Sequence, residues 1–324
     1  MPGINGYVTI TTFFKEELIM TLTELATEWV ETYQRDHIKH QTYIKYKCCI
    51  RNYIEPVIGE RDIGEFTRRS IQDYINALKK TNGLHTRKTL SASTVNAVLT
   101  TLKLIFSYAV DFDMLPANPT ERVRGAKRVA ERDLKCFTLE EQRLIEEYCY
   151  GKNDAYWFGI VLDLYTGLRM GELLALEWKD LDLESGVISI NKTVYISKDD
   201  NGTWKEMTDT PKSRTSYREI PLPAHMVAQL RRLRSCSDSR RIISRSDGTP
   251  LDNKRYRYTY NAMLDELGIR HISFHSLRHT FATRAIESGM DVKTLSEILG
   301  HANASITVHI NYPHTSDYLK VKAA

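Results

Sequence analysis

One stretch of the chain, "LPANPTERVRGAKRVAERDLK" at residues 115–135, has two prolines, many positive charges and no apolar periodicity. These features are typical of an exposed connection rather than of a helix or strand. Before this stretch the apolar residues follow a helical spacing, whereas after it helical and strand patterns alternate. A chain of 324 residues is long enough for two cores of ordinary size. The sequence therefore predicts two domains.

The first part, residues 21–118, is predicted to be a compact domain of four helices. A capping box from Thr21 to Glu24 opens the first helix. We expect the second helix to run from Gln41 to Ile54 and to end ahead of Pro56, and the third to cover residues 68–80. The fourth carries apolar residues at helical spacing from Val95 to Ala109. The expected inward faces of the first two helices are Leu22, Leu25, Ala26, Trp29, Tyr33, Tyr46, Cys49, Ile50 and Tyr53.

The second part, residues 137–324, is predicted to mix helices with a small β-sheet. A second capping box joins Thr138 and Glu141, and a helix that ends at Gly167 is followed by a short one from Arg169 to Leu176. Strand patterns and an Asn-Gly turn occupy residues 187–222. Further helices are expected at residues 253–267, 276–287 and 291–299. The fold class is therefore α+β and mainly helical.

Composition excludes several classes of protein. With 42% hydrophobic and 27% charged residues, the chain is typical of globular proteins. Its longest apolar runs, such as residues 157–165, are too short to cross a membrane, and residues 1–20 lack the features of a signal peptide. Five cysteines without a CxxC pair argue against disulfides and a zinc ribbon. We therefore expect a cytoplasmic protein with reduced thiols and no membrane partner, in which residues 1–20 are an N-terminal extension.

Positive charge is concentrated in two clusters, although the net charge is only +4. Residues 122–135 contain six basic side chains, and residues 231–245 contain six arginines. Such clusters can neutralise the phosphates of DNA, but solvated surfaces have the same composition. Charge alone leaves both interpretations open.

Four short motifs contain the residues suited to phosphate chemistry. They are "TGLRMGEL" with Arg169, "TPKSRTSYREIPLP" with Lys212, "FHSLRHT" with His275 and Arg278, and "LGHANASITVHINYPH" with His301 and Tyr312. Guanidinium and ammonium groups bind phosphate oxygens, and an ammonium can also give up a proton. A tyrosine can act as a nucleophile if a histidine receives its proton. Each motif alone is weak, but together they fit one reaction.

In this order, the motifs closely resemble those of the tyrosine recombinases, the phage integrase family. The resemblance covers about residues 20–314 and implies that Tyr312 attacks a DNA phosphate, forming a 3′-phosphotyrosyl link without any cofactor. Lys212 would protonate the leaving 5′ oxygen, and Glu172 would orient the basic residues. The scissile phosphate would be held by Arg169, Arg278, His275 and His301.

The resemblance also implies an organisation on DNA. Residues 21–118 would be the core-binding domain and residues 137–324 the catalytic domain, and together they would clamp double-stranded recombination sites. The basic linker, residues 119–136, would contact the duplex through Arg122, Arg124, Lys127 and Arg128. A homo-tetramer is implied, with an accessory excisionase or DNA-bending protein as a further partner, in the integration or excision of a mobile element.

Several alternatives remain open from the sequence. Tyr318 competes with Tyr312 as the nucleophile. His275 and His279 have the spacing of two zinc ligands, but no carboxylate or thiolate ligand accompanies them, so no metal is expected. An Xer-like recombinase that resolves chromosome dimers would share every catalytic residue. Other possibilities are a topoisomerase-like relaxing enzyme and a DNA-binding protein of this fold that has lost catalysis.

Overall fold

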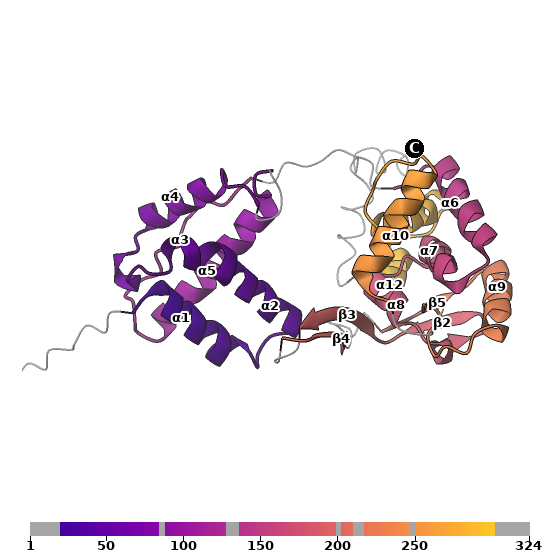
Figure 1. Ribbon diagram of the computed structural model, residues 1–324, viewed down its shortest axis with the longest axis horizontal. Coiled ribbons are helices and arrows are strands. Elements are labelled where there is room, and N and C mark those ends of the chain that lie inside the picture. The colour runs from indigo at the N-terminus through magenta and orange to yellow at the C-terminus, as the bar shows by residue number, and fades with distance from the viewer. Residues whose placement is uncertain are drawn as a thin grey trace, which may run out of the picture. The chain divides into compact units, whose positions relative to one another are not determined.

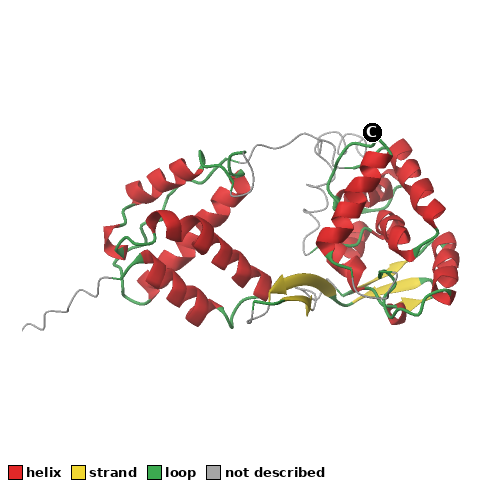
Figure 2. Cartoon of the chain, in the orientation of Figure 1, coloured by secondary structure: helices red, strands yellow, loops and turns green. Residues whose placement is uncertain are grey.

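The computed structural model describes residues 20–83, 88–127, 136–198, 202–209, 217–245 and 251–301. The chain forms two compact units, Met1–Ala130 and Glu131–Ala324. Helices dominate both units, and among the described residues extended strands occur in the second unit alone (Figure 2). The chain is thus α+β and mainly helical, as the sequence predicts.

The first unit is built from helices (Figure 1). The capping box between Thr21 and Glu24 is present at the start of the first helix, and Thr67 and Ser91 cap the two longest of the later ones. Two stretches of π-helix, Trp29–Gln34 and Ile50–Ile54, continue the first two helices. The α-helices are α1 (Leu22–Glu28), α2 (His40–Cys49), α3 (Glu55–Ile58), α4 (Arg68–Leu78) and α5 (Ala92–Asp111).

Helix α5 supplies much of the core of this unit. Its length and composition would suit a membrane span, but half of its apolar window is buried inside the protein. The helical spacing of apolar residues predicted from Val95 to Ala109 is confirmed. The side chains that form it are all buried: Val95, Val98, Leu99, Leu102, Ile105, Phe106 and Ala109. They pack with buried residues of the other helices, among them Leu22, Leu25, Trp29, Ile54, Ile71 and Ile75.

Of two predictions for this unit, one is confirmed and one was wrong. The second helix, with its π-helical continuation, ends at Ile54 ahead of Pro56, and the short α3 follows at Glu55 with the proline in its first turn. Proline is tolerated there, since the first N–H groups of a helix have no intrahelical acceptor. Tyr33 is 44% exposed rather than inward, and its ring lies 5.2 Å from that of the buried Tyr108.

The first part of the predicted linker is folded onto this unit. The side chain of Gln72 bonds to both the N–H and the carbonyl of Arg124, at 2.8 and 3.1 Å. The side chain of Asn96 does the same at Ala126, and Val123, the residue before the first of these anchors, is buried. The backbone up to residue 127 therefore follows the helices, while Arg128 lies outside the described residues.

Within the part of the chain that the structure describes, the second unit contains seven α-helices and two small sheets, with a large core and a smaller apolar cluster between α11 and α12. The helices are α6 (Leu139–Lys152), α7 (Ala155–Thr166), α8 (Met170–Ala175), α9 (Ala224–Ser235), α10 (Asn253–Glu266), α11 (Ser276–Glu287) and α12 (Val292–Leu299). The capping box between Thr138 and Glu141 and the end of α7 at Gly167 are confirmed. Helix α9 was not predicted, although Met226, Leu230 and Leu233 form its buried face.

The strands form two sheets rather than the one predicted. Strands β1 (Leu181–Asp182), β2 (Val187–Ile190) and β5 (Arg218–Pro221) make an antiparallel sheet in the order β1-β2-β5. Strands β3 (Thr193–Lys198) and β4 (Trp204–Asp209) form a separate antiparallel pair. The strand pattern "GVISINKTVYI" at residues 186–196 is divided at Asn191 and Lys192 between β2 and β3, which belong to different sheets.

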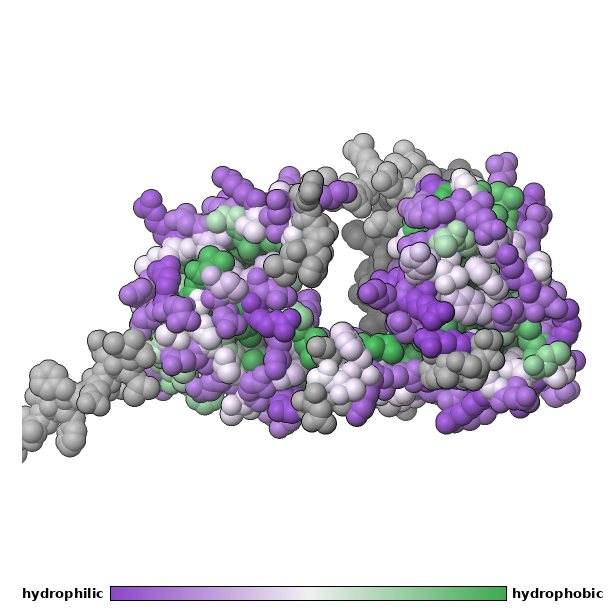
Figure 3. Space-filling view, in the orientation of Figure 1, coloured by the Kyte–Doolittle hydropathy of each residue, from purple (hydrophilic) through white to green (hydrophobic). Residues whose placement is uncertain are grey.

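The arginines of residues 231–245 mostly bind the protein itself. Arg241 pairs with Glu206, Arg240 with Glu177, and Arg231 with the carbonyl of Leu183. These contacts favour a structural role for this cluster over a DNA-binding one. Hydrophilic residues cover most of both units in the view of Figure 3, with apolar residues in small separate patches, which agrees with the two buried cores.

Candidate active site

Arg278 is the buried centre of a network of basic side chains. It lies on α11 with 2% of its surface exposed. Its guanidinium donates to the carbonyls of Gly167 and Leu299, each at 2.7 Å, and to Nε2 of His301 at 2.8 Å. Burial, followed by the positive charge of Arg169, lowers the pKa of Arg278 to about 9, so it is charged at neutral pH.

Two helix ends supply the carbonyls that hold the arginines. Helix α7 ends at Gly167 and α12 ends at Gly300, and both glycines have a left-handed backbone, with φ of 61° and 63°. Last-turn carbonyls of a helix have no intrahelical donor and attract cations. The Gly167 carbonyl accepts from Arg278, and the Gly300 carbonyl accepts from Arg169 at 3.0 Å.

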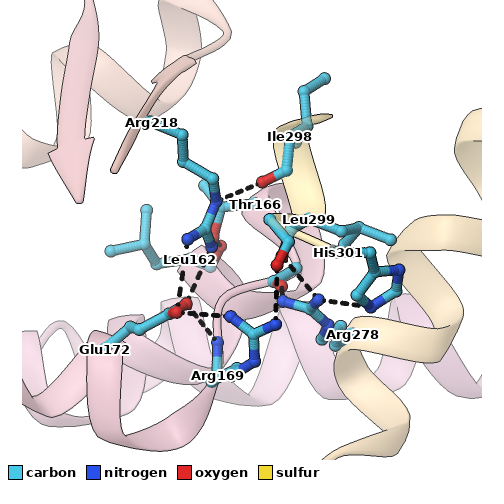
Figure 4. A network of polar contacts seen from close by, with 11 residues as sticks. Leu162, Thr166, Arg169, Glu172, Arg218, Arg278, Ile298, Leu299 and His301 are labelled. Atoms are coloured by element: carbon cyan, nitrogen blue, oxygen red, sulfur yellow. Dashed lines mark hydrogen bonds and ion pairs between the residues drawn. The ribbon is translucent and has the colours of Figure 1, made fainter. Parts of the chain in front are cut away.

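Arg169 precedes the first turn of α8. Its guanidinium donates to Glu172 at 2.7 Å, and its backbone N–H donates to the same carboxylate at 3.0 Å. The side chain is 40% exposed, unlike that of Arg278. Figure 4 shows the two guanidinium groups side by side, so positive charge from α8 and α11 converges at one place.

Glu172 lies between two arginines. Arg218, on β5, donates to Glu172 Oε2 at 2.8 Å from the side opposite Arg169 (Figure 4). Burial alone would raise the pKa of Glu172, but hydrogen bonds and charge from Arg218, together with the charge of Arg169, lower it to about 2. The carboxylate is therefore ionised and unsuited to proton transfer at neutral pH.

The two predicted histidines are neutral in this environment. Arg278 can only donate, so Nε2 of His301 accepts and carries no proton. Burial and the charges of Arg278 and Arg169 lower the pKa of His301 to about 4. Burial, with nearby His279 and Arg278, likewise lowers the pKa of His275 to about 4, although the residue as a whole is exposed to solvent. Neutral imidazoles can receive protons from a substrate or nucleophile.

A buried carboxyl group, Asp163, lies behind the network on α7. It is fully buried, and neither oxygen has a hydrogen-bond partner among the described residues. Burial raises its pKa well above the ordinary value, and the positive charge of Arg278 offsets only part of this.

The structure brings five of the predicted site residues together: Arg169, Glu172, His275, Arg278 and His301. Lys212, Tyr312 and the competing Tyr318 lie outside the described residues. No three His, Cys, Asp or Glu side chains gather as metal ligands in the described ranges. Sequence reasoning missed Arg218 and Asp163. Arg218 follows Lys212 by six residues inside "YREIPLP", but a strand pattern does not tell which alternate residue is buried.

The first unit has a basic hollow of its own. Its volume is about 430 Å³, and it is lined by Arg68, Arg69, Gln72, Asp73, Arg122 and Arg124. Arg68 and Arg69 lie in the first turn of α4, where cations are unfavourable without an anion nearby. Arg122, Arg124 and Lys127 are exposed, so the hollow concentrates positive charge on one surface.

Two family models match the chain. Residues 21–79 match the phage integrase N-terminal SAM-like domain, and residues 139–318 match the phage integrase family. The chain belongs to the phage integrase family. It is therefore a tyrosine recombinase, an enzyme that cleaves and rejoins DNA, as the motifs predicted.

Proteins similar to this recombinase include an XerC-like tyrosine recombinase and integrases. A tyrosine recombinase XerC-like protein of Caldanaerobacter subterraneus subsp. tengcongensis is 30% identical over 333 residues, covering 94% of this chain and 82% of the relative. The Tn1549 transposon integrase, solved with circular intermediate DNA, aligns with a TM-score of 0.78 at 22% identity, over 94% of this chain and 98% of that one. A lambda integrase tetramer bound to a Holliday junction aligns at 0.67 with 19% identity, over 88% of this chain and 79% of that one.

Proposed function

We propose that this recombinase cuts and rejoins its DNA at the site formed by Arg169, Arg278, His275 and His301, with Tyr312 as nucleophile and Lys212 as general acid. The convergence of Arg169 and Arg278 supports this assignment most directly. Among the described residues Arg169 uses two of its five N–H donors, and its side chain is 40% exposed, so three donors remain there for the oxygens of a phosphate.

The proposed reaction exchanges one phosphate ester for another. The phenol oxygen of Tyr312 bonds to phosphorus, the bond from phosphorus to the 5′ oxygen breaks, and the 3′ end stays linked to the enzyme. Charge that develops on the non-bridging oxygens is stabilised by the two arginines. Because the phosphotyrosyl link keeps the energy of the broken ester, rejoining needs no ATP.

Proton transfer at the two ends of the reaction falls to different residues. The phenol proton goes to a histidine, and the neutral state of His275 suits it for receiving the proton, whereas His301 would first have to release its bond to Arg278. Their low pKa values hold without DNA, and a phosphate anion beside them would raise those values. Lys212 gives its proton to the leaving 5′ oxygen.

The basic hollow of the first unit is proposed to bind the DNA backbone. Arg122, Arg124 and Lys127 would contact phosphates together with Arg68 and Arg69. Replacing Arg122 and Arg124 by alanine should weaken binding for all sequences and reduce the slope of log K against log salt by about one per lost contact. Arg231→Ala, which removes an arginine already bonded to Leu183, should leave the slope unchanged. Equal slopes in all three proteins would contradict a DNA-binding role.

The cellular role is proposed to be integration and excision of a mobile element. The similarity to the Tn1549 transposon integrase over nearly the whole chain supports this role. The XerC-like relative favours a second candidate, chromosome dimer resolution. Mapping the DNA junctions made by the enzyme separates them, since an element integrase joins element ends to a target whereas a resolvase joins two copies of one chromosomal site.

The assembly is proposed to be a homo-tetramer on two DNA duplexes in the cytoplasm. The lambda integrase tetramer on a Holliday junction supports this stoichiometry for the fold. An excisionase or DNA-bending protein would set the direction of recombination.

The covalent intermediate provides the test of the proposed chemistry. A nicked duplex that carries the recombination site and loses its 5′ fragment after cleavage should trap the protein joined to DNA. Tyr312→Phe should abolish the adduct, and Tyr318→Phe should retain it. An adduct that persists in Tyr312→Phe and disappears in Tyr318→Phe would overturn the assignment of the nucleophile.

A further inference from the structure

Arg218 is a buried arginine outside the predicted catalytic set. Its side chain is 5% exposed and extends from β5 into the site. The guanidinium bonds to Glu172 through two nitrogens, Nη2 to Oε2 at 2.8 Å and Nη1 to Oε1 at 3.3 Å. Its Nε donates to the carbonyl of Ile298, in the last turn of α12. Arg218 therefore joins three elements, β5, α8 and α12.

Both residues that hold Arg169 are in contact with Arg218. Arg169 is fixed by the Glu172 carboxylate and by the Gly300 carbonyl. Arg218 bonds the carboxylate and packs against the glycine residue, because a Cβ placed on Gly300 would lie 3.1 Å from Arg218 Nη1. A side chain with this geometry can control where the Arg169 guanidinium points without touching DNA.

Charge makes a purely structural role for Arg218 unfavourable. A buried ion pair can usually be replaced by apolar side chains at little cost in stability. Here the buried arginine also adds a third positive charge beside Arg169 and Arg278. The two-nitrogen contact keeps Glu172 ionised and in one orientation, which a shorter or apolar residue could not do.

We propose that Arg218 is a positioning residue for DNA cleavage, which locks Glu172 and the end of α12 so that Arg169 is held ready for the scissile phosphate. Arg218 is also the first residue of β5, six residues after Lys212 in the sequence. It therefore joins the strand that follows the proposed general acid to the same network. This inference rests on the proposed function of Arg169 and Lys212.

The test compares variants that keep or lose the two-nitrogen contact. Arg218→Met should reduce the single-turnover cleavage rate of the nicked duplex about tenfold to a hundredfold, while DNA affinity changes by less than about threefold, because the residue acts on a phosphate ligand rather than on DNA. Arg218→Lys keeps the charge and should recover part of the rate. The matched control is Arg270→Met, which removes an arginine that pairs with Glu141 at 3.0 Å in the same unit.

A double-mutant cycle with Glu172→Gln separates positioning from folding. If Arg218 acts through Glu172, the double variant should cleave about as slowly as the slower single variant, whereas independent effects would multiply. Multiplied effects, or an equal loss of rate in Arg270→Met, would overturn the proposal. If Arg218→Met does not fold, as judged by thermal unfolding, the cycle is run with Arg218→Lys. Failure of the proposed function is detected separately. If Tyr312 is not the nucleophile, Tyr312→Phe retains the adduct, and the cleavage rates in the double-mutant cycle still show whether Arg218 acts through Glu172.

Discussion

The carbonyl oxygen of Gly167 accepts a 2.7 Å hydrogen bond from the guanidinium of Arg278, which lies 111 residues later in the chain. The contact requires α7 and α11 to approach closely at this glycine. A Cβ on Gly167 would lie 2.5 Å from the ring of Phe281, one turn after Arg278 on the same helix. The glycine thus permits both the left-handed end of α7 and the approach of the arginine.

Gly167→Ala should therefore impair stability and cleavage together. Left-handed backbone costs a non-glycine residue about 1–2 kcal/mol, and the overlap with Phe281 should add about 1–3 kcal/mol. Gly268→Ala is the control, because Gly268 has a similar φ of 64° but no atom within 4 Å of its would-be Cβ. Gly167→Ala should lose more than Gly268→Ala both in the free energy of unfolding, measured in urea, and in the cleavage rate. Equal losses in the two variants would show that the contact with α11 does not matter.

Asp163→Asn should change how stability depends on pH. Burial raises the pKa of the folded carboxyl well above 3.8, so above that pH the unfolded chain binds fewer protons than the folded one. Stability of the wild type therefore falls as pH rises from about 4 towards the folded pKa. Asparagine does not titrate. The free energy of unfolding of Asp163→Asn, measured in urea, should therefore increase relative to that of the wild type between pH 5 and pH 8.

An exposed aspartate provides the control for this measurement. Hydrogen bonds from Ser185 and Glu184 lower the pKa of Asp182, so its contribution is complete above pH 4 and is lost only in more acidic solution. Asp182→Asn should then shift stability by a constant amount between pH 5 and pH 8. A parallel pH dependence for wild type and Asp163→Asn would mean that Asp163 is ionised in the folded protein.

The sequence predicted best those parts of the fold that local interactions determine. The capping boxes at Thr21 and Thr138 and the helix at residues 276–287 were correct, because caps and apolar spacing act within one or two turns. The division of residues 187–198 into two strands of different sheets was missed, since it depends on which distant strand each segment pairs with. Helix α9 was not predicted, because the arginines in its second half interrupt the apolar pattern that Met226 and Leu230 begin.

Site residues that lie in short motifs could be predicted from the sequence. Residues whose role depends on being buried in the folded protein could not. Arg169 and Arg278 occur in short patterns that limit the chemistry. Arg218 and Asp163 occur in segments whose sequence patterns predict a strand and an apolar helix and nothing more. Only the folded chain shows that Arg218 is 5% exposed and turned towards Glu172, and that Asp163 has no hydrogen-bond partner among the described residues.

Cleavage should persist when divalent metals are removed. In the proposed mechanism, Arg169, Arg278 and Lys212 supply the positive charge that a metal ion would otherwise provide to a phosphate transition state. The adduct on the nicked duplex should form at an unchanged rate in EDTA at constant ionic strength, since lower salt by itself strengthens DNA binding. Loss of the adduct in EDTA, with recovery on adding magnesium or zinc, would reveal a metal requirement.

Lys212 can be tested by changing the atom that leaves. A 5′ alkoxide is a poor leaving group, so a general acid should contribute about 10² to 10⁴ in rate, whereas a thiolate leaves without a proton. With sulfur in place of the bridging 5′ oxygen, Lys212→Ala should regain most of its lost cleavage rate. Arg278→Ala is the matched variant and should regain little, because the proposed role of Arg278 is to stabilise charge on the non-bridging oxygens. Equal rescue of both variants, or rescue of neither, would show that Lys212 positions the phosphate, and the general acid would then be sought at His275 or His301.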